Sequence, residues 1–332
     1  MGILNLSVEI LLMIGEYLSI KDLSCFFSTC HLLSSTLFTN HLHNRFLRAK
    51  GACTVLQSAA KYNQISLAKL AISKGAGVGC ESGPSGSGPR TPPALHMAAR
   101  YNSPDVIRIL FEHGAEIDAL YGLDTPLSLA TWHKCLKAVR VLLELGAKIP
   151  REPIGPAWEP PTHVSARSGD INFMQAFVDI GFDFNTRGYN GQTVLHVAIC
   201  SGEKKMLEYL LQQEGCVAII KAYDSNGYTP MHSAVLRCGG EGMVRLLLHY
   251  GANSGLIDWR DFRGNTPLHL AVRSNSEVEE KVRLLLRGGA KTKLRNYNGY
   301  TPADIAKICK MEVLHKMLLE GLGNGLEQEF MD

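Results

Sequence analysis

A six-residue motif recurs along this chain at nearly constant intervals. Its weaker copies, TVLQSA, PALHMA and PPTHVS, begin at residues 54, 93 and 160. The clearest copies are TPLSLA from Thr125, TVLHVA from Thr193, TPMHSA from Thr229, TPLHLA from Thr266 and TPADIA from Thr301. The eight starts lie 32 to 39 residues apart, a period typical of arrays in which each unit packs only against its neighbours. The sequence therefore predicts a stack of small units rather than one large core.

A glycine keeps phase with the motif. It follows each start by 20 to 23 residues, at Gly75, Gly114, Gly146, Gly181, Gly215, Gly251, Gly289 and Gly321. Threonine before proline predicts an N-cap and a first helical residue, and the glycine predicts a left-handed residue that ends a second helix. Apolar residues at helical spacing lie between them, for example Val282, Leu285 and Leu286. Each unit is thus predicted to be helix, turn, helix and loop.

These residues resemble the ankyrin repeat, whose signature is T-P-L-H-x-A with a period near 33 residues. The resemblance implies an all-α solenoid over residues 51–325, followed by a tail at 326–332. It also implies hairpin-like loops between the units. The turns of these loops are expected at residues 224–227, 261–264 and 296–299, each of which ends in glycine, the residue that tolerates a positive φ.

Residues 1–50 do not fit the repeat. The run LNLSVEILLMIGEYLSIKDLSCFFSTCHLLSSTL resembles an F-box, a three-helix module, with Ser7 in place of the family's proline. The positions that match the F-box pattern are Leu6, Glu9, Ile10, Leu11, Ile14, Leu18, Asp22, Leu23, Phe26, Cys30 and Leu33. An F-box before ankyrin repeats is similar to a class of proteins of filamentous fungi. The alternative is a plain helical cap that covers the end of the array.

The F-box resemblance implies docking on the Skp-type adaptor of a cullin-RING ubiquitin ligase. The adaptor-binding residues that it implies are Leu6, Glu9, Ile10, Leu11, Ile14, Leu18 and Leu23. The ankyrin face would then hold a target protein. With the cap alternative, the chain is instead a protein-binding scaffold without a role in ubiquitin transfer.

Composition excludes several other classes of protein. The net charge of +3 is too balanced for a nucleic-acid footprint. Glu9 and Glu16 interrupt the apolar stretch near the N-terminus, and no run of 18 apolar residues predicts a membrane span. The nine cysteines are scattered without a CxxC pair, which predicts neither a disulfide framework nor a zinc knuckle. We therefore expect a reduced chain in the cytoplasm, the nucleus or both.

No catalytic motif such as GxSxG, HExxH or a phosphate-binding glycine loop occurs. Five histidines occupy the fourth motif position, one in each of five units, at His96, His163, His196, His232 and His269. Their separation favours a structural, hydrogen-bonded role over metal binding. The sequence thus predicts no enzyme, no cofactor and no metal site.

Aromatic residues and arginines gather at the predicted loop tips, with Tyr121 and Tyr223 among them. Tyrosine, tryptophan and arginine are enriched in the residues that dominate protein interfaces. The tips are therefore the predicted target-binding surface. The residues assigned to it are Trp158, Tyr189, Tyr228, Trp259, Arg260, Phe262, Arg263, Tyr297 and Tyr300. The competing interpretation is that several of these rings pack back on the helices.

Overall fold

A computed structural model of the chain describes residues 52–79, 92–149, 159–251, 255–274 and 277–320. Within these ranges the regular structure is helical and no strand forms; a single bridge pairs Tyr121 with Asp124. The prediction of an all-α fold is confirmed. The F-box-like segment, with its seven predicted adaptor-binding residues, and Trp158 lie outside the described residues. No described helix is long and apolar enough to cross a membrane.

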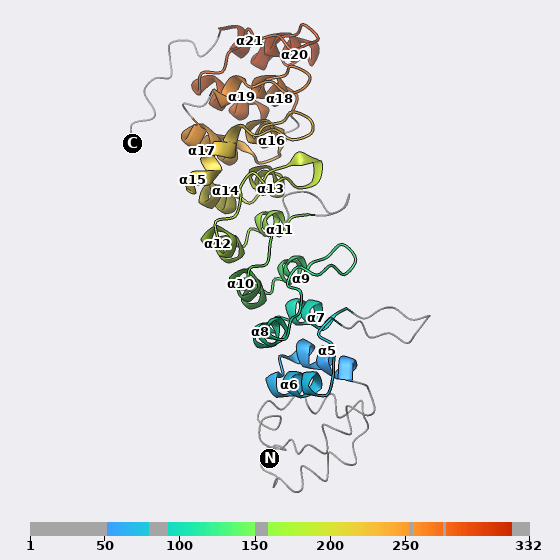
Figure 1. The fold of residues 1–332 in the computed structure, drawn as a ribbon. Coiled ribbons are helices and arrows are strands. Elements are labelled where there is room, and N and C mark those ends of the chain that lie inside the picture. Colours follow the sequence, from blue (N-terminus) through green and yellow to red (C-terminus); the bar gives the residue numbers. More distant parts are fainter. Residues whose placement is uncertain (1–51, 80–91, 150–158, 252–254, 275–276, 321–332) are drawn as a thin grey trace, which may run out of the picture. The chain divides into compact units, whose positions relative to one another are not determined.

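The chain divides into two compact units at residues 149 and 150. The described residues of the first unit form three helix pairs. In them α5, α7 and α9 contact one another in order, and α6, α8 and α10 do the same (Figure 1). The pairs are α5 (Ala52–Tyr62) with α6 (Ile65–Ser73), α7 (Ala94–Arg100) with α8 (Pro104–Glu112), and α9 (Pro126–Trp132) with α10 (Leu136–Glu144).

The described part of the second unit forms five pairs arranged in the same way, with one column of first helices and one of second helices (Figure 1). Its pairs are α11 (Pro161–Ser168) with α12 (Ile171–Asp179), α13 (Val194–Ser201) with α14 (Lys204–Leu211), α16 (Pro230–Leu236) with α17 (Glu241–Gly251), α18 (Pro267–Val272) with α19 (Val278–Arg287), and α20 (Pro302–Ile308) with α21 (Glu312–Glu320). A short helix, α15 (Glu214–Ala218), follows α14.

The motif threonines begin the first helices as predicted. Thr125 and Thr301 have extended backbone angles, and each side chain accepts a bond from the N–H three residues on, at 3.1 and 3.2 Å. Capping of this kind satisfies N–H groups that the helix itself leaves without a partner. The copy from Thr54 is different, because Thr54 lies inside α5 rather than before it.

The glycines that follow the second helices are left-handed in five units, with φ between 69° and 90° at Gly75, Gly114, Gly146, Gly181 and Gly289. The prediction is wrong for two others. Gly215 lies within the separate short helix α15, and Gly251 is itself the last residue of α17, so neither is a left-handed residue after a second helix. Gly321 lies outside the described residues.

Five described cysteines are free thiols, at positions 135, 200, 216, 238 and 309. Cys53, in contrast, takes part in a disulfide. The expectation of a chain with all its thiols reduced is therefore wrong at Cys53.

Candidate protein-binding surface

Three loop tips of the second unit share one local structure. Asp224, Asp261 and Asn296 each begin a turn in which one side-chain oxygen accepts the backbone N–H groups two and four residues on, at 2.7 to 3.1 Å. The glycine three residues on is left-handed, with φ of 80°, 75° and 81°. The sequence Asx-x-x-Gly therefore builds the same tight turn three times.

Successive tips are joined by backbone hydrogen bonds. The N–H of Ser225 donates to the carbonyl of Asn190 (2.8 Å), that of Phe262 to Asn226 (3.3 Å) and that of Tyr297 to Arg263 (3.1 Å). One N–H of each tip thus pairs with the preceding tip, so that the turns stack in register. The side chains at equivalent positions consequently form a row along this edge of the second unit.

The aromatic side chains of this row lean on the preceding turn and remain exposed. A Cβ added to Gly227 would lie 2.7 Å from the ring of Phe262, and one added to Gly264 would lie 2.7 Å from the ring of Tyr297. Each ring therefore covers the glycine of the turn before it. Nevertheless Phe262 is 60% and Tyr297 71% exposed. Such rings are fixed in place yet available to a partner, which lowers the entropic cost of binding.

Two arginines support the same edge. Arg187 donates to the carbonyl of Tyr223 (2.8 Å), and Arg260 donates to the carbonyl of Arg295 (2.9 Å). Each bond reaches the equivalent position of the next repeat. Arg260 therefore contributes to stacking as well as to the surface, whereas Arg263, at the tip itself, is exposed.

The structure brings most of the predicted target-binding residues onto this one edge. Those exposed there are Tyr189, Trp259, Arg260, Phe262, Arg263, Tyr297 and Tyr300. Tyr228 differs, because it is half-buried and its ring stacks on His232 with the ring centroids 5.9 Å apart. Among the described residues of the predicted target-binding surface, Tyr228 is thus the one whose ring packs back on a helix. Binding of a target by the exposed residues stays a prediction.

The motif histidines link each repeat to the next. Their Nε2 atoms lie 2.8 to 3.3 Å from the carbonyl oxygens of Asp124, Gln192, Tyr228, Asn265 and Tyr300, in chain order. A carbonyl can only accept, so Nε2 carries the proton. In His196, His232 and His269, Nδ1 accepts the N–H of the motif threonine at 3.1 to 3.2 Å. Burial lowers the pKa of His163 and of His232 to about 4, so both rings are neutral at pH 7.

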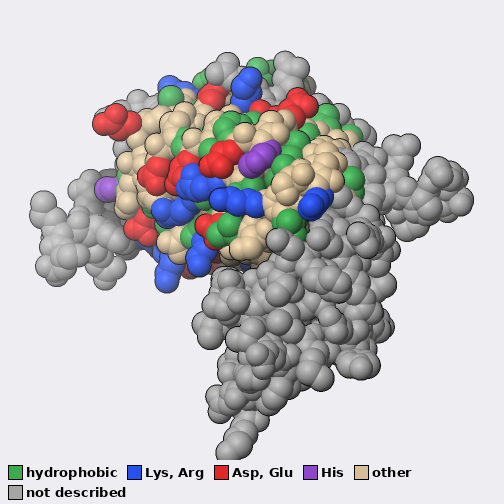
Figure 2. All heavy atoms as spheres, turned by 60° about the horizontal axis from the view of Figure 1, so that its bottom comes forward, with side chains coloured by type: hydrophobic (Ala, Val, Ile, Leu, Met, Phe, Trp, Pro, Cys, Tyr) green, Lys and Arg blue, Asp and Glu red, His purple; other side chains and the backbone are tan. Residues whose placement is uncertain are grey.

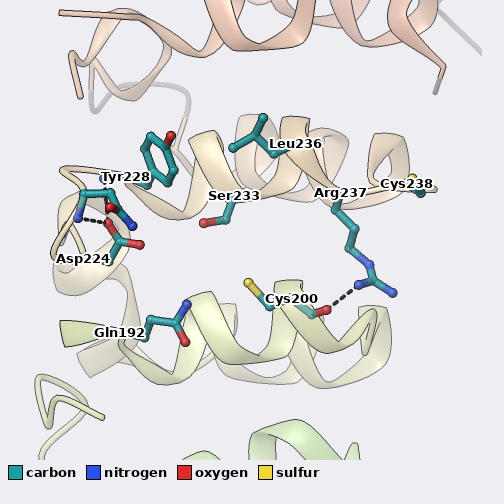
Figure 3. Close-up of a pocket in the computed structure, with 9 residues that line it drawn as sticks. Gln192, Cys200, Asp224, Tyr228, Ser233, Leu236, Arg237 and Cys238 are labelled. Carbon is teal, nitrogen blue, oxygen red and sulfur yellow. Dashed lines mark hydrogen bonds between the residues drawn. The ribbon is translucent and has the colours of Figure 1, made fainter. Parts of the chain in front are cut away.

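A pocket of about 500 Å³ opens between α13 and α16, beside the tip at residues 224–227. In Figure 3, Asp224 and Tyr228 stand at one end and Arg237 at the other, with Cys200 and Ser233 between them. The residues that line the pocket are Gln192, Cys200, Asp224, Asn226, Tyr228, Ser233, Leu236, Arg237 and Cys238. Apart from Tyr228, none of these residues was predicted as a site, because the pocket depends on how two repeats meet.

The pocket is suited to binding rather than to catalysis. Burial raises the pKa of the Cys200 thiol, and a protonated thiol is a poor nucleophile. Arg237 donates to the Cys200 carbonyl, and its own carbonyl accepts from the buried Lys281 at 2.6 Å. These bonds fix the far end of the pocket. Within the described residues, no group of three His, Cys, Asp or Glu side chains is placed to hold a metal ion.

The surface elsewhere is of mixed charge. Figure 2 shows acidic and basic side chains beside one another on the face that it presents, with apolar side chains scattered among them. The described part of this face therefore lacks the single-sign stripe that marks nucleic-acid binding.

Comparison with known families identifies the fold. The family profile described as ankyrin repeats in three copies matches residues 31–121, 56–152 and 162–258, and that of the single ankyrin repeat matches 263–297. The chain belongs to the ankyrin-repeat family. The neutral, bridging histidines and the stacked tips described above are thus features of an ankyrin array.

Two relatives and two solved structures place the array more closely. The B-cell lymphoma 3 protein homolog of Mus musculus is 31% identical over 64% of this chain, and human ankyrin repeat and SOCS box protein 16 is 30% identical over 59%. The matches span only 39% and 45% of those proteins. The ankyrin repeat domain of Bcl-3 superposes with a TM-score of 0.56 at 28% identity, over 64% of this chain and 92% of that domain. Human ASB11 shares the fold, at 23% identity over 70% of this chain and 96% of that one, with a TM-score of 0.53.

Proposed function

We propose that the protein is a substrate-recognition subunit of an SCF-type cullin-RING E3 ubiquitin ligase in the cytoplasm or nucleus. Residues 1–50 dock on the Skp-type adaptor, and the ankyrin tips of the second unit bind the target. The chain contributes proximity and not acid–base chemistry, because holding a target near the transfer machinery raises its effective concentration.

The observation that carries the target-binding half is the row of exposed aromatic and arginine side chains on stacked tips. Phe262 and Tyr297 occupy the same position in consecutive turns, and each is held by the turn before it. Ankyrin repeats bind protein partners. A rigid, regularly spaced aromatic row suits an extended segment of a partner, since buried aromatic anchors dominate interface energetics.

The adaptor half rests on the F-box pattern from Leu6 to Leu33. Support for the arrangement comes from the human relative, whose name couples ankyrin repeats with a second, box-type module in one protein. The same arrangement, with a recognition array and a separate docking module, is what we propose for this chain.

The adaptor half is tested with the full-length chain and a purified Skp-type adaptor. We expect the two to co-purify and expect Leu6→Asp, Ile10→Asp and Leu18→Asp each to abolish the complex. Leu319→Asp is the matched control, because Leu319 is 66% exposed on α21, far along the sequence from the box. Loss of helicity in the variants is checked by circular dichroism. A folded chain that binds no adaptor would refute the ligase role.

That negative outcome would favour the second candidate, an ankyrin scaffold whose N-terminal helices only cap the array. The scaffold shares the target surface and lacks the adaptor, so the target test below applies to both candidates.

The target half is tested by quantitative affinity capture from cells that express the protein. The pair Phe262→Ala with Tyr297→Ala should release the partners that the unaltered chain retains, by about tenfold or more. Leu319→Ala removes a side chain of similar exposure from α21, the second helix of its pair, and should leave capture unchanged. Equal loss in both variants would show that the tips are not the binding surface.

A further inference from the structure

Asp224 has one carboxylate oxygen that accepts no hydrogen bond from any described residue. The residue is only 5% exposed. Its Oδ1 accepts the N–H groups of Asn226 and Tyr228, at 2.8 and 3.0 Å. Oδ2 has no such partner and, in Figure 3, points into the pocket between α13 and α16. Because most of the residue is buried, the pocket is where this oxygen offers an unused acceptor to a partner.

The equivalent positions in the next two turns show what is missing. Asp261 is 2% exposed, and its Oδ2 accepts from Asn265 Nδ2 at 3.0 Å. Asn265 Oδ1 in turn accepts from Asn296 Nδ2 at 2.8 Å. The fifth residue of the Asp261 turn is thus an asparagine that completes a closed network. In the Asp224 turn the fifth residue is Tyr228, which has no side-chain amide to donate to the second carboxylate oxygen.

The side chains around Asp224 Oδ2 suit a cation. Asp224 is the only acidic residue among the nine that line the pocket, and the Gln192 and Asn226 amides offer further carbonyl acceptors. The half-buried Tyr228 ring borders the same end (Figure 3), and an aromatic face attracts a cation placed within about 6 Å. The single lining cation, Arg237, stands at the opposite end and is engaged with the Cys200 carbonyl.

We propose that this pocket receives a basic side chain, arginine or lysine, of the target protein. Its charged group donates to Asp224 Oδ2 beside the Tyr228 ring, and the remainder of the target lies along the tips. This inference rests on the proposed target-binding function. It adds that the target must present a positively charged side chain, which binding to the exposed aromatic row alone does not require.

The test uses the full-length chain and a small probe, so that no target need be known. N-acetyl-arginine amide is titrated into isotopically labelled protein while the backbone amide signals of Gly227 and Tyr228 are followed. The neutral isostere N-acetyl-citrulline amide is titrated in parallel. We expect saturable shifts with the arginine probe, and binding of the citrulline probe that is weaker by about tenfold or more, since one charge-assisted bond commonly contributes that much.

Asp224→Asn is the informative variant, because Asn296 already makes the same turn with an amide. The variant should fold normally and bind the arginine probe about tenfold more weakly. Asp261→Asn is the control, since it removes the same charge from a turn whose oxygens are both occupied, and it should leave probe binding unchanged. N-acetyl-lysine amide tests whether an ammonium group binds as well.

Equal binding of the arginine and citrulline probes, equal binding by Asp224→Asn, or no binding of the arginine probe would each overturn the proposal. These outcomes are separate from those of the capture experiment. A chain that retains targets through Phe262 and Tyr297 but ignores the arginine probe would keep the proposed function and lose the cation pocket.

Discussion

The turns at residues 224–228 and 261–265 have nearly the same backbone conformation but differ in their aspartates. Both carboxylate oxygens of Asp261 accept hydrogen bonds, whereas only one oxygen of Asp224 does. Both begin with a buried aspartate, have a left-handed glycine as the fourth residue and have that glycine covered by an aromatic ring of the following turn. The motif histidine of the preceding repeat also bonds to the fifth residue of each turn, His196 to the Tyr228 carbonyl and His232 to the Asn265 carbonyl. The one decisive difference is the fifth residue, Tyr228 or Asn265. A single side chain therefore separates a closed structural network from an open pocket.

The largest effect that we expect concerns the histidines that hold these turns. The folded pKa of His163 and of His232 is about 4, against an ordinary value of 6.5. The folded pKa is depressed, so the stabilisation is complete above pH 6.5. As the pH falls from there towards 4, the unfolded chain takes up protons that the folded chain does not. The loss is on the order of 3 kcal/mol for each histidine.

Urea unfolding at a series of pH values across that window measures this loss. The charged and titratable groups that influence His232 are Asp261, Asp224 and His196. His232→Gln should reduce the pH dependence by about one proton while keeping the cap, since glutamine also serves at this position. An unchanged pH dependence in that variant would assign the effect to other groups.

The second prediction tests whether the two turns are truly equivalent. Gly227→Ala and Gly264→Ala each force a left-handed alanine and a Cβ within 2.9 Å of an aromatic ring. Each should cost about 3 kcal/mol in the free energy of unfolding. Gly299→Ala meets the same φ with open space around the Cβ and should cost about 1 to 2 kcal/mol. A much smaller loss of stability for Gly227→Ala than for Gly264→Ala would show that the two turns are not equivalent.

The third prediction opens the closed network. Asn265→Ala leaves Asp261 Oδ2 without its donor and Asn296 Nδ2 without its acceptor, and should cost about 1 to 3 kcal/mol. Asn226→Ala is the control, because Asn226 is exposed and its side chain has no described hydrogen bond; the change should stay within about 0.5 kcal/mol. Equal stability of the two variants in chemical denaturation would show that the network contributes nothing.

The smallest effect is expected at Asp224 itself. Asp224→Asn removes a buried charge that lacks a full set of partners, so it should leave the free chain as stable or raise the free energy of unfolding by up to about 1 kcal/mol. Asp261→Asn should instead lower it, because the Asn265 amide loses a charged acceptor. Denaturation midpoints of the two variants, measured side by side, decide the sign. A clear loss in Asp224→Asn would mean that the free protein already uses this charge.

Much of this architecture followed from the sequence. The motif threonines, the histidine slot and the glycines of the three tips could be assigned because each depends on residues close together in one repeat. The two glycines assigned wrongly are helical: Gly215 lies in α15, a short extra helix after α14, and Gly251 is the last residue of α17. Local spacing cannot show whether a helix stops at a glycine or passes through it.

The pocket is the part that the sequence did not predict. It arises where α13 and α16 meet. One oxygen of Asp224 has no donor because Tyr228 stands at the position where Asn265 donates to Asp261 in the next turn. The tip row could be proposed from aromatic content, but the different position of Tyr228, stacked on His232, needed the packed structure. The repeat motif thus predicts the contacts within one repeat but not the contacts between neighbouring repeats.

The bonds from tip to tip and from histidine to the next repeat also have a mechanical consequence. Within the second unit they run in series, and each spans one junction between consecutive repeats. A load applied along the stack would pass through every junction in turn and would be shared by few bonds at each. The unit should therefore yield under tension in small steps, one repeat after another, and reclose in the same way when the tension is released.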